Sequence, residues 1–215
     1  MSRYVSVLLV ICGIGASAFA SVQGGVSTDS AVRQIQANID DWQNEEAKAA
    51  PERDSSCREA RLIRIVWKSG LVASPPIKLA TMPKLMTLPI SSQSVTDFVN
   101  EAFNGVDLGA TEQSELDGLK NRAIRSDADN LGLAIGAQQL AIAVSNRIFS
   151  ASIETYYDRA LVADSYSKLD GAEDTCNEDT LRLSRDGAMI AASQVLLELY
   201  RQQSAAAQAA VPARD

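Results

Sequence analysis

Apolar positions recur at helical spacing along most of the chain, and the longest run of them begins near Asp127. It predicts one helix that continues to Lys168, about 40 residues or about 60 Å long. Because the repeat is close to 3.5 residues, it favours left-handed antiparallel packing against other helices. The stripe consists of Leu131, Ile135, Gln138, Ile142, Ser145, Phe149, Ser152 and Tyr156.

An earlier helix is predicted from about Thr28 to about Ala50. Residues 28–30 offer N-cap oxygens, and Pro51 fits the first turn of a separate second helix. Segment 55–68 contains both helical and alternating patterns, so its type stays open. The apolar stripe of the first helix is Val32, Ile35, Ile39 and Trp42.

A last helix is predicted after Gly171, which we expect to break the long one. Asp174, Thr175 or Asn177 can cap its N-terminus, and its Ala/Gln-rich tail should fray after Gln202. Its apolar band consists of Leu181, Ala188, Met189, Ala192, Val195, Leu196 and Leu199.

The middle of the chain has a different character. Four prolines between Gly70 and Ile90 forbid a long helix in a segment that is nevertheless rich in apolar residues. We expect an irregular appendage here, followed by short helices at 94–103 and 111–122. The second of these should turn Leu116 and Leu119 inward.

These elements predict an all-α fold, an elongated antiparallel three-helix bundle with an irregular Pro-rich or small helical appendage. The expected parts are a signal peptide (1–20), a leader and bundle helix (21–50), the appendage (51–125), two long bundle helices (126–203) and a flexible tail (204–215).

The N-terminus has the features of a secretory signal. Arg3 precedes an apolar run over 5–14, which has the length of a signal h-region and is too short to span a bilayer. Small residues at Ala18 and Ala20 predict cleavage before Ser21. We therefore expect an exported protein of the periplasm and the cell surface.

Export bears on the two cysteines that remain after cleavage, Cys57 and Cys176. An oxidising compartment favours a disulfide between them, and the alternative is two separate buried thiols.

The net charge and the residue types of the chain argue against several classes of function. The net charge is −7, and an acidic surface repels a phosphate backbone, which argues against nucleic-acid binding. Absence of histidine removes the common nucleophilic triads and histidine zinc sites. Glu154 and Asp158 lie one helical turn apart beside Arg159, which indicates a solvated face more than a catalytic pair. We expect neither an enzyme nor a cofactor.

Two short motifs have simple structural interpretations. Asp127, Asp129 and Gly132 imitate part of a calcium loop, but Gln138 stands where that loop needs its bidentate glutamate. We interpret them as acidic residues at a helix N-terminus. The G-x-x-x-G pattern that Gly132 forms with Gly136 indicates close helix packing.

Two features point to contacts with other molecules. Segment 51–85 carries seven positive and three negative charges. Its arginines could dock an acidic partner or pair subunits, or they could form a solvated face paired with Asp54 and Glu59. The apolar appendage, in turn, could cover the bundle or be exposed as a contact surface. The basic residues are Arg58, Arg61, Arg64 and Lys68, and the candidate contact residues are Trp67, Leu85 and Met86.

Local motifs in the last helix add a family resemblance. They are Leu183-Ser184-Arg185, Met189 and Leu196-Leu197, followed by the Ala/Gln-rich tail, with a fainter Ser126-Asp127-Ala128-Asp129 before the long helix. Together with the architecture, they resemble the minor pilin or pilus-tip subunits of type IV secretion and conjugation systems, in particular the member from the plant-tumour T-DNA transfer system. The cysteine pair and the basic segment depart from that family's pattern.

The resemblance implies a non-catalytic subunit at the distal end of a pilus. Its partners would be the major pilin, an inner-membrane channel subunit, further copies of itself and a recipient-cell surface. The alternative is an unrelated periplasmic helical binding module or chaperone.

Overall fold

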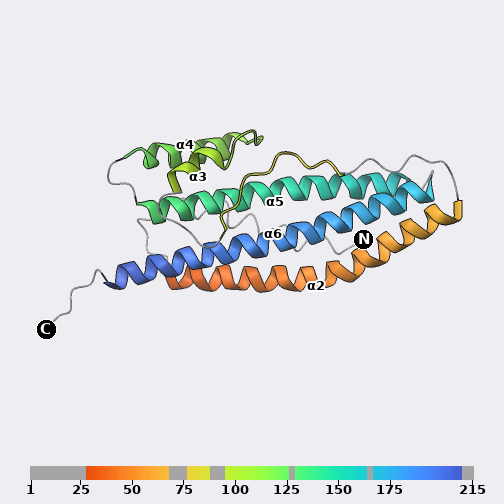
Figure 1. Cartoon of the computed structure of the whole chain (residues 1–215), viewed down its shortest axis with the longest axis horizontal. Helices are drawn as coiled ribbons and strands as arrows, with labels where there is room; N and C mark the ends of the chain where they lie inside the picture. Colours follow the sequence, from red (N-terminus) through yellow and green to blue (C-terminus); the bar gives the residue numbers. More distant parts are fainter. Residues whose placement is uncertain (1–27, 68–76, 88–94, 126–128, 164–166, 210–215) are drawn as a thin grey trace.

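The computed structural model describes residues 28–67, 77–87, 95–125, 129–163 and 167–209 (Figure 1). All regular structure in these ranges is helical, which confirms the all-α prediction. The predicted signal peptide and its cleavage site at Ala20 and Ser21 lie outside them. The helices are α2 (Thr28–Trp67), α3 (Val95–Glu101), α4 (Ala110–Ala123), α5 (Asn130–Ala163) and α6 (Lys168–Ala209).

The long helix α6 packs along α2 on one side and along α5 on the other (Figure 1). Contacts between α2 and α6 run in opposite order along the two helices. Trp42 of α2 faces Arg185, whereas Arg64, further along α2, pairs with Glu173, earlier in α6. The short helices α3 and α4 pack on each other and on α5.

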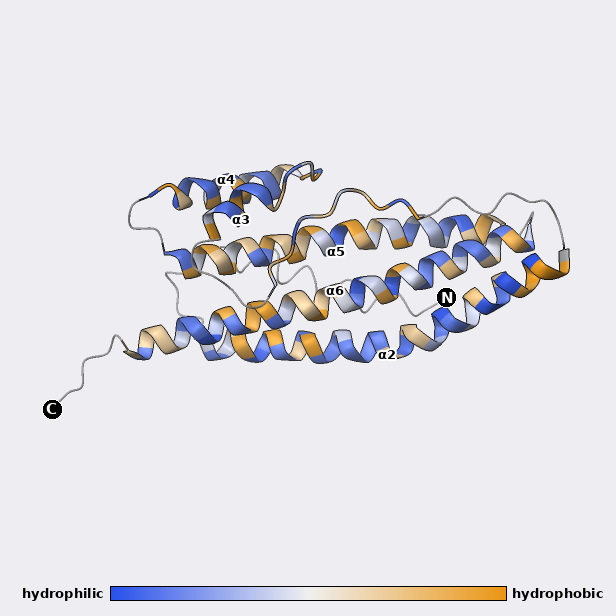
Figure 2. Cartoon of the chain, viewed as in Figure 1, coloured by the Kyte–Doolittle hydropathy of each residue, from blue (hydrophilic) through white to orange (hydrophobic). Residues whose placement is uncertain are grey.

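The main core lies where α5 meets α6, α3 and α4. Figure 2 shows hydrophobic residues concentrated along α5 and the C-terminal half of α6, while α2 is mostly hydrophilic. Leu140 of α5 and Leu199 of α6 are almost completely buried. Burial of each such side chain contributes about 1.5 to 3 kcal/mol, so this junction holds the long helices together.

The prediction of a helix break at Pro51 was wrong, because α2 is continuous to Trp67. Proline lacks the N–H that would bond the preceding turn, and in a helix interior this costs about 3 kcal/mol. Residues on both sides of the proline, Ala49 and Ala60, are nevertheless buried. Packing along α6 therefore outweighs the local cost, and α2 changes direction near its middle (Figure 1). Segment 55–67 is helical.

The prediction that Gly171 breaks the long helix was also wrong. Helix α5 already ends at Ala163, and Gly171 is buried inside α6. The hydroxyl of Ser167 accepts a hydrogen bond from the Asp170 amide at 3.3 Å, so the α6 N-terminus lies before the glycine. A buried glycine costs about 1 kcal/mol relative to alanine, little beside the packing of this long helix. Consequently Asp174, Thr175 and Asn177 lie within α6 and do not cap it. The tail is helical to Ala209.

The stripe predicted for α5 is only part of its buried face. Five of its eight positions are buried, while Leu131, Ile142 and Ser152 are partly exposed. Residues outside the stripe, including Ala137 and Ala141, are completely buried. Burial is this broad because α5 is covered by α3 and α4 as well as by α6. The predicted band of α6 is confirmed, with Ala188 partly buried.

The Pro-rich stretch between Gly70 and Ile90 is irregular over its described part, residues 77–87, whereas residues 51–67 of the predicted appendage belong to α2. The side chain of Gln138, completely buried on α5, accepts a hydrogen bond from the Met86 amide and donates one to the Ala192 carbonyl, both at 3.0 Å. One amide side chain thus joins the segment to α5 and α6. The two short helices are also confirmed, with Leu116 and Leu119 buried.

The structural interpretations of the motifs before and within α5 are confirmed for Asp129 and Gly136. Asp127 lies outside the described residues, and a Cβ at Gly132 would meet Asp129 and not another helix. The Asp129 carboxylate accepts hydrogen bonds from the amides of Leu131 and Gly132, so it caps α5. A Cβ at Gly136 would lie 2.9 Å from Leu119 Cδ2, so this glycine permits the close approach of α4.

Candidate interaction surface at the disulfide-linked end

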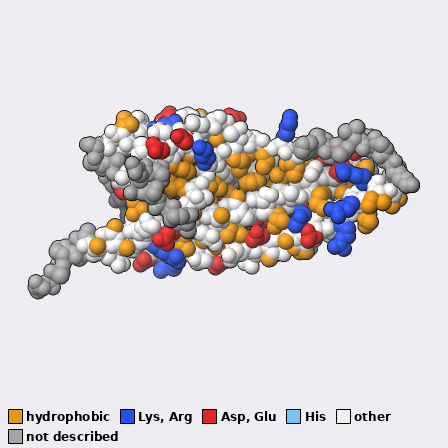
Figure 3. All heavy atoms as spheres, in the orientation of Figure 1, with side chains coloured by type: hydrophobic (Ala, Val, Ile, Leu, Met, Phe, Trp, Pro, Cys, Tyr) orange, Lys and Arg blue, Asp and Glu red, His pale blue; other side chains and the backbone are white. Residues whose placement is uncertain are grey.

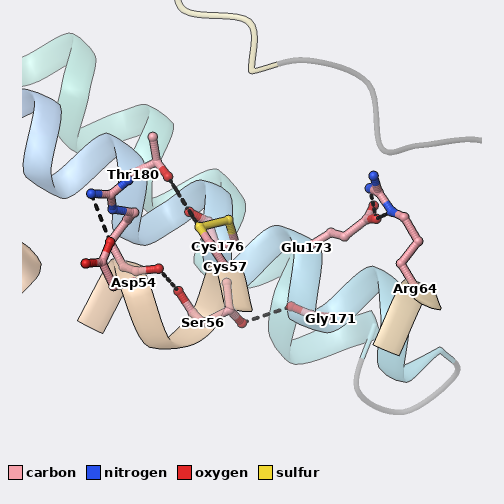
Figure 4. Close-up of a disulfide and its surroundings, with 10 residues drawn as sticks. Asp54, Ser56, Cys57, Arg64, Gly171, Glu173, Cys176 and Thr180 are labelled. Atoms are coloured by element: carbon pink, nitrogen blue, oxygen red, sulfur yellow. Dashed lines mark hydrogen bonds and ion pairs between the residues drawn. A yellow bond between two sulfur atoms is a disulfide. The ribbon is translucent and has the colours of Figure 1, made fainter. Parts of the chain in front are cut away.

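A disulfide joins α2 to α6 through Cys57 and Cys176, as the sequence predicted (Figure 4). The two Cα atoms are 4.7 Å apart, and the bond closes a loop across 119 positions of the chain. Both cysteines are half-buried. The bond fixes the register of α2 on α6 close to the end of the rod.

Two ion pairs bring the ends of α2 and α5 to the same turn of α6. The Arg64 guanidinium of α2 pairs with Glu173 (Figure 4), and Nη2 of Arg159 on α5 lies 3.1 Å from Asp174 Oδ1. Glu173 and Asp174 are neighbours in the chain. The last turns of α2 and α5 therefore both lie beside the same turn of α6.

The acidic partners in these pairs are more buried than the arginines. The Asp174 side chain is 5% exposed and the Arg159 side chain 45%. Burial raises the pKa of the Asp174 carboxyl, and the charge of Arg159 opposes that rise. The same pattern continues along α6, where burial raises the pKa of Glu178 and of Asp186 although each has an arginine partner.

These carboxylates form a structural series along α6 and do not converge on one point. Each pairs with a different arginine, and Arg185 also lies 5.0 Å from the ring centre of Trp42. Across the described ranges no group of three His, Cys, Asp or Glu side chains could hold a metal ion. Glu173 and Asp174 attach α2 and α5 to α6, whereas Glu178 and Asp186 pair with arginines of α6 itself. Glu154 and Asp158, the pair considered from the sequence, are both exposed.

Beyond the disulfide, α2 turns an apolar face to solvent. The exposed fractions are 55% for Leu62, 63% for Ile65 and 76% for Val66. Arg58 and Arg61 are exposed beside them. Figure 3 shows Lys and Arg side chains gathered with hydrophobic ones over this end, and the end of α2 is hydrophobic in Figure 2. We call Arg58, Arg61, Leu62, Ile65 and Val66 the distal face.

The C-terminal end of α5 adds exposed aliphatic side chains at the same end of the rod. Leu161 is 56% exposed and Val162 is 62% exposed. A shallow open depression beside them is lined by Asp158, Arg159, Val162, Ala163 and Asp174.

The structure places the sequence-predicted contact residues differently from one another. Trp67 is the last residue of α2, and its side chain is not among those that the structure describes. Met86 is 9% exposed, and Leu85 packs partly buried against the main core. The described part of the appendage therefore covers the bundle within the chain, one of the two possibilities left open by the sequence.

The arginines that the sequence analysis grouped together do not make the same kind of contact. Arg64 pairs with Glu173 across the helix contact, and Asp54 pairs with its neighbour Arg53 at 2.9 Å. Among described residues no ion pair links Arg58 or Arg61 to Asp54 or Glu59, the partners considered for a solvated face. Sequence reasoning noted these two arginines but missed the aliphatic residues that follow them on the same face, Leu62, Ile65 and Val66.

Spacing could have located the missed residues. Cys57, Ala60 and Arg64 follow at i, i+3 and i+7, and all three contact α6 through a disulfide, burial or an ion pair. A bridged Cys57 therefore identifies the inner side of α2, and the distal face lies on the other side.

Neither a protein-family model, nor a curated protein, nor a solved structure matches the chain. No helix in the described ranges is long and apolar enough to cross a lipid bilayer.

Proposed function

We propose that this protein is an exported, non-enzymatic structural or adhesive subunit at the pilus of a type IV secretion or conjugation apparatus. In this proposal its frame is an elongated antiparallel three-helix bundle with α6 in the middle, and its distal end contacts other components. The observation that carries the proposal is a helical rod braced by the Cys57–Cys176 disulfide, with an uncovered aliphatic and basic surface at the braced end.

A braced rod suits a mechanical role. The disulfide and the ion pairs of Glu173 and Asp174 hold α2 and α5 in one register on α6, so a load on the distal end passes to α6 and to its contacts with α5. The proposed partners are the major pilin, an inner-membrane channel subunit, further copies of the chain and a recipient-cell surface.

The second candidate is an unrelated periplasmic helical binding module or chaperone. The same exposed aliphatic residues favour it, because a holdase also needs uncovered apolar surface.

Deletion of the gene in its host tests the proposal. We expect loss of pilus assembly and of conjugative or effector transfer, both restored by the wild-type gene. We also expect genes for a channel, an ATPase and a major pilin to lie beside this gene. Normal pili and normal transfer in the deletion strain would contradict the proposal. General envelope stress in place of a transfer defect would favour the second candidate.

A further inference from the structure

The distal face is an amphipathic helix surface that no part of the described chain covers. Residues 58, 61, 62, 65 and 66 follow at i, i+3, i+4, i+7 and i+8, which places them on one side of α2. All five are exposed. An outward helix face is normally polar, so the three aliphatic side chains that follow the two arginines on this face are expected to contact something other than water.

We propose that the distal face docks the rod onto an anionic phospholipid bilayer. The aliphatic side chains of Leu62, Ile65 and Val66 would enter the boundary between headgroups and acyl chains, and Arg58 and Arg61 would lie at the lipid phosphates. This proposal rests on the proposed function only in taking the distal end as the contact surface, and it names what that surface contacts.

Charge is the first reason to choose a lipid surface. The chain carries a net charge of −7, so an anionic membrane repels the protein as a whole. At the distal face Arg58 and Arg61 supply two exposed positive charges, whereas Arg64 and Arg159 are balanced by Glu173 and Asp174. Binding is therefore restricted to this end.

Shape and size are the second reason. The aliphatic side chains are on the outer side of a helix at the end of a rod, where they protrude. A stable protein interface engages about 20 to 30 residues on each side, many more than this face provides. A bilayer accepts a small protruding apolar surface without a complementary pocket.

The end of α5 carries further exposed aliphatic side chains at the same end of the rod. Leu161 and Val162 lie at the level of the rod fixed by the Arg64–Glu173 and Arg159–Asp174 pairs. An amphipathic helix face lies in the plane of the interface, so α2 would lie along the bilayer at this end of the rod, while α3 and α4 are at the other end (Figure 1).

Vesicle cosedimentation of the purified, oxidised mature protein tests the inference. We expect binding to vesicles of equal parts phosphatidylglycerol and phosphatidylcholine, weakening with added salt, and no binding to phosphatidylcholine alone. The variant Arg58→Gln with Arg61→Gln should bind roughly 30-fold more weakly, since each arginine near an anionic surface contributes about fivefold. Ile65→Ser with Val66→Ser should bind about tenfold more weakly, because the apolar contact is lost.

The chain provides a matched control outside the distal face. Ile124 is 81% exposed beside the exposed Arg125, so Ile124→Ser with Arg125→Gln removes one aliphatic and one basic side chain elsewhere. It should bind vesicles like the wild type. Thermal melts of all variants should match the wild type, since the exchanged side chains are exposed.

Three results would overturn the inference: no binding of the wild type to anionic vesicles, equal binding to neutral ones, or equal weakening by the control variant. Absent lipid binding combined with a transfer defect in the Ile65→Ser, Val66→Ser strain would assign the face to a protein partner, and the proposed function would stand. Lipid binding with normal transfer in the deletion strain would refute the proposed function and leave this inference intact.

Discussion

Removal of the disulfide gives the most direct test of how the rod is held together. In the variant Cys57→Ala with Cys176→Ala, the unfolded chain regains the freedom that the bond removes. For a loop of 119 positions, the chain-entropy relation gives about 5 kcal/mol of lost stability. For a domain of this size, that corresponds to a fall in Tm of about 10 to 20 °C.

The local effect should be concentrated on one half of α2. Beyond Pro51, the described contacts of α2 with α6 include buried Ala60, the disulfide and the Arg64–Glu173 pair. Arg64 is half exposed, and such ion pairs contribute little. In the double variant we therefore expect hydrogen exchange to accelerate over 51–67 and to change little over 28–50.

Urea unfolding of the oxidised protein, the double variant and the reduced wild type measures the effect. The two bond-free samples should agree and should show a higher m-value, because their unfolded chain is more expanded. A loss below about 1 kcal/mol, or uniform acceleration of exchange along α2, would refute the reasoning.

The remaining predictions concern buried polar side chains. Gln138→Leu leaves the Met86 amide without its partner and should cost about 1 to 3 kcal/mol in urea unfolding; no loss would contradict its joining role. Ser145→Asp should lower the Tm more than Ile142→Asp, because Ser145 is completely buried and Ile142 is not, and the opposite order would contradict this packing. Burial raises the pKa of Asp186, so the folded state holds this proton more tightly and stability falls as pH rises from 3.8 through the raised pKa. Asp186→Asn should flatten that part of a stability–pH curve, and an unchanged slope would contradict the assignment.

The sequence predicted helices well and their ends poorly. The burial of Leu116, Leu119, Met189 and Leu199 follows from periodicity, because a helix in a bundle must cover its apolar side. Pro51 disfavours a continuous helix, whereas packing against α6 stabilises one. Local propensity alone cannot predict which effect is larger, because the residues of α6 lie more than a hundred positions away in the chain.

The candidate surface was predictable in part. The expectation of export and the number of cysteines predicted the disulfide, and the spacing of basic residues identified Arg58 and Arg61. Apolar residues are assigned to the core by default, so Ile65 and Val66 could not be recognised as exposed until Cys57 had fixed which side of α2 faces α6.

Site-specific photo-crosslinking in the host cell tests the central claim, that the distal end is the contact surface, most directly. A photoreactive residue in place of Ile65 should form adducts with anionic phospholipid or with the major pilin or channel subunit. The same residue in place of Ile124 should form none of them. Absence of these adducts from position 65, or equal adducts from both positions, would contradict the account.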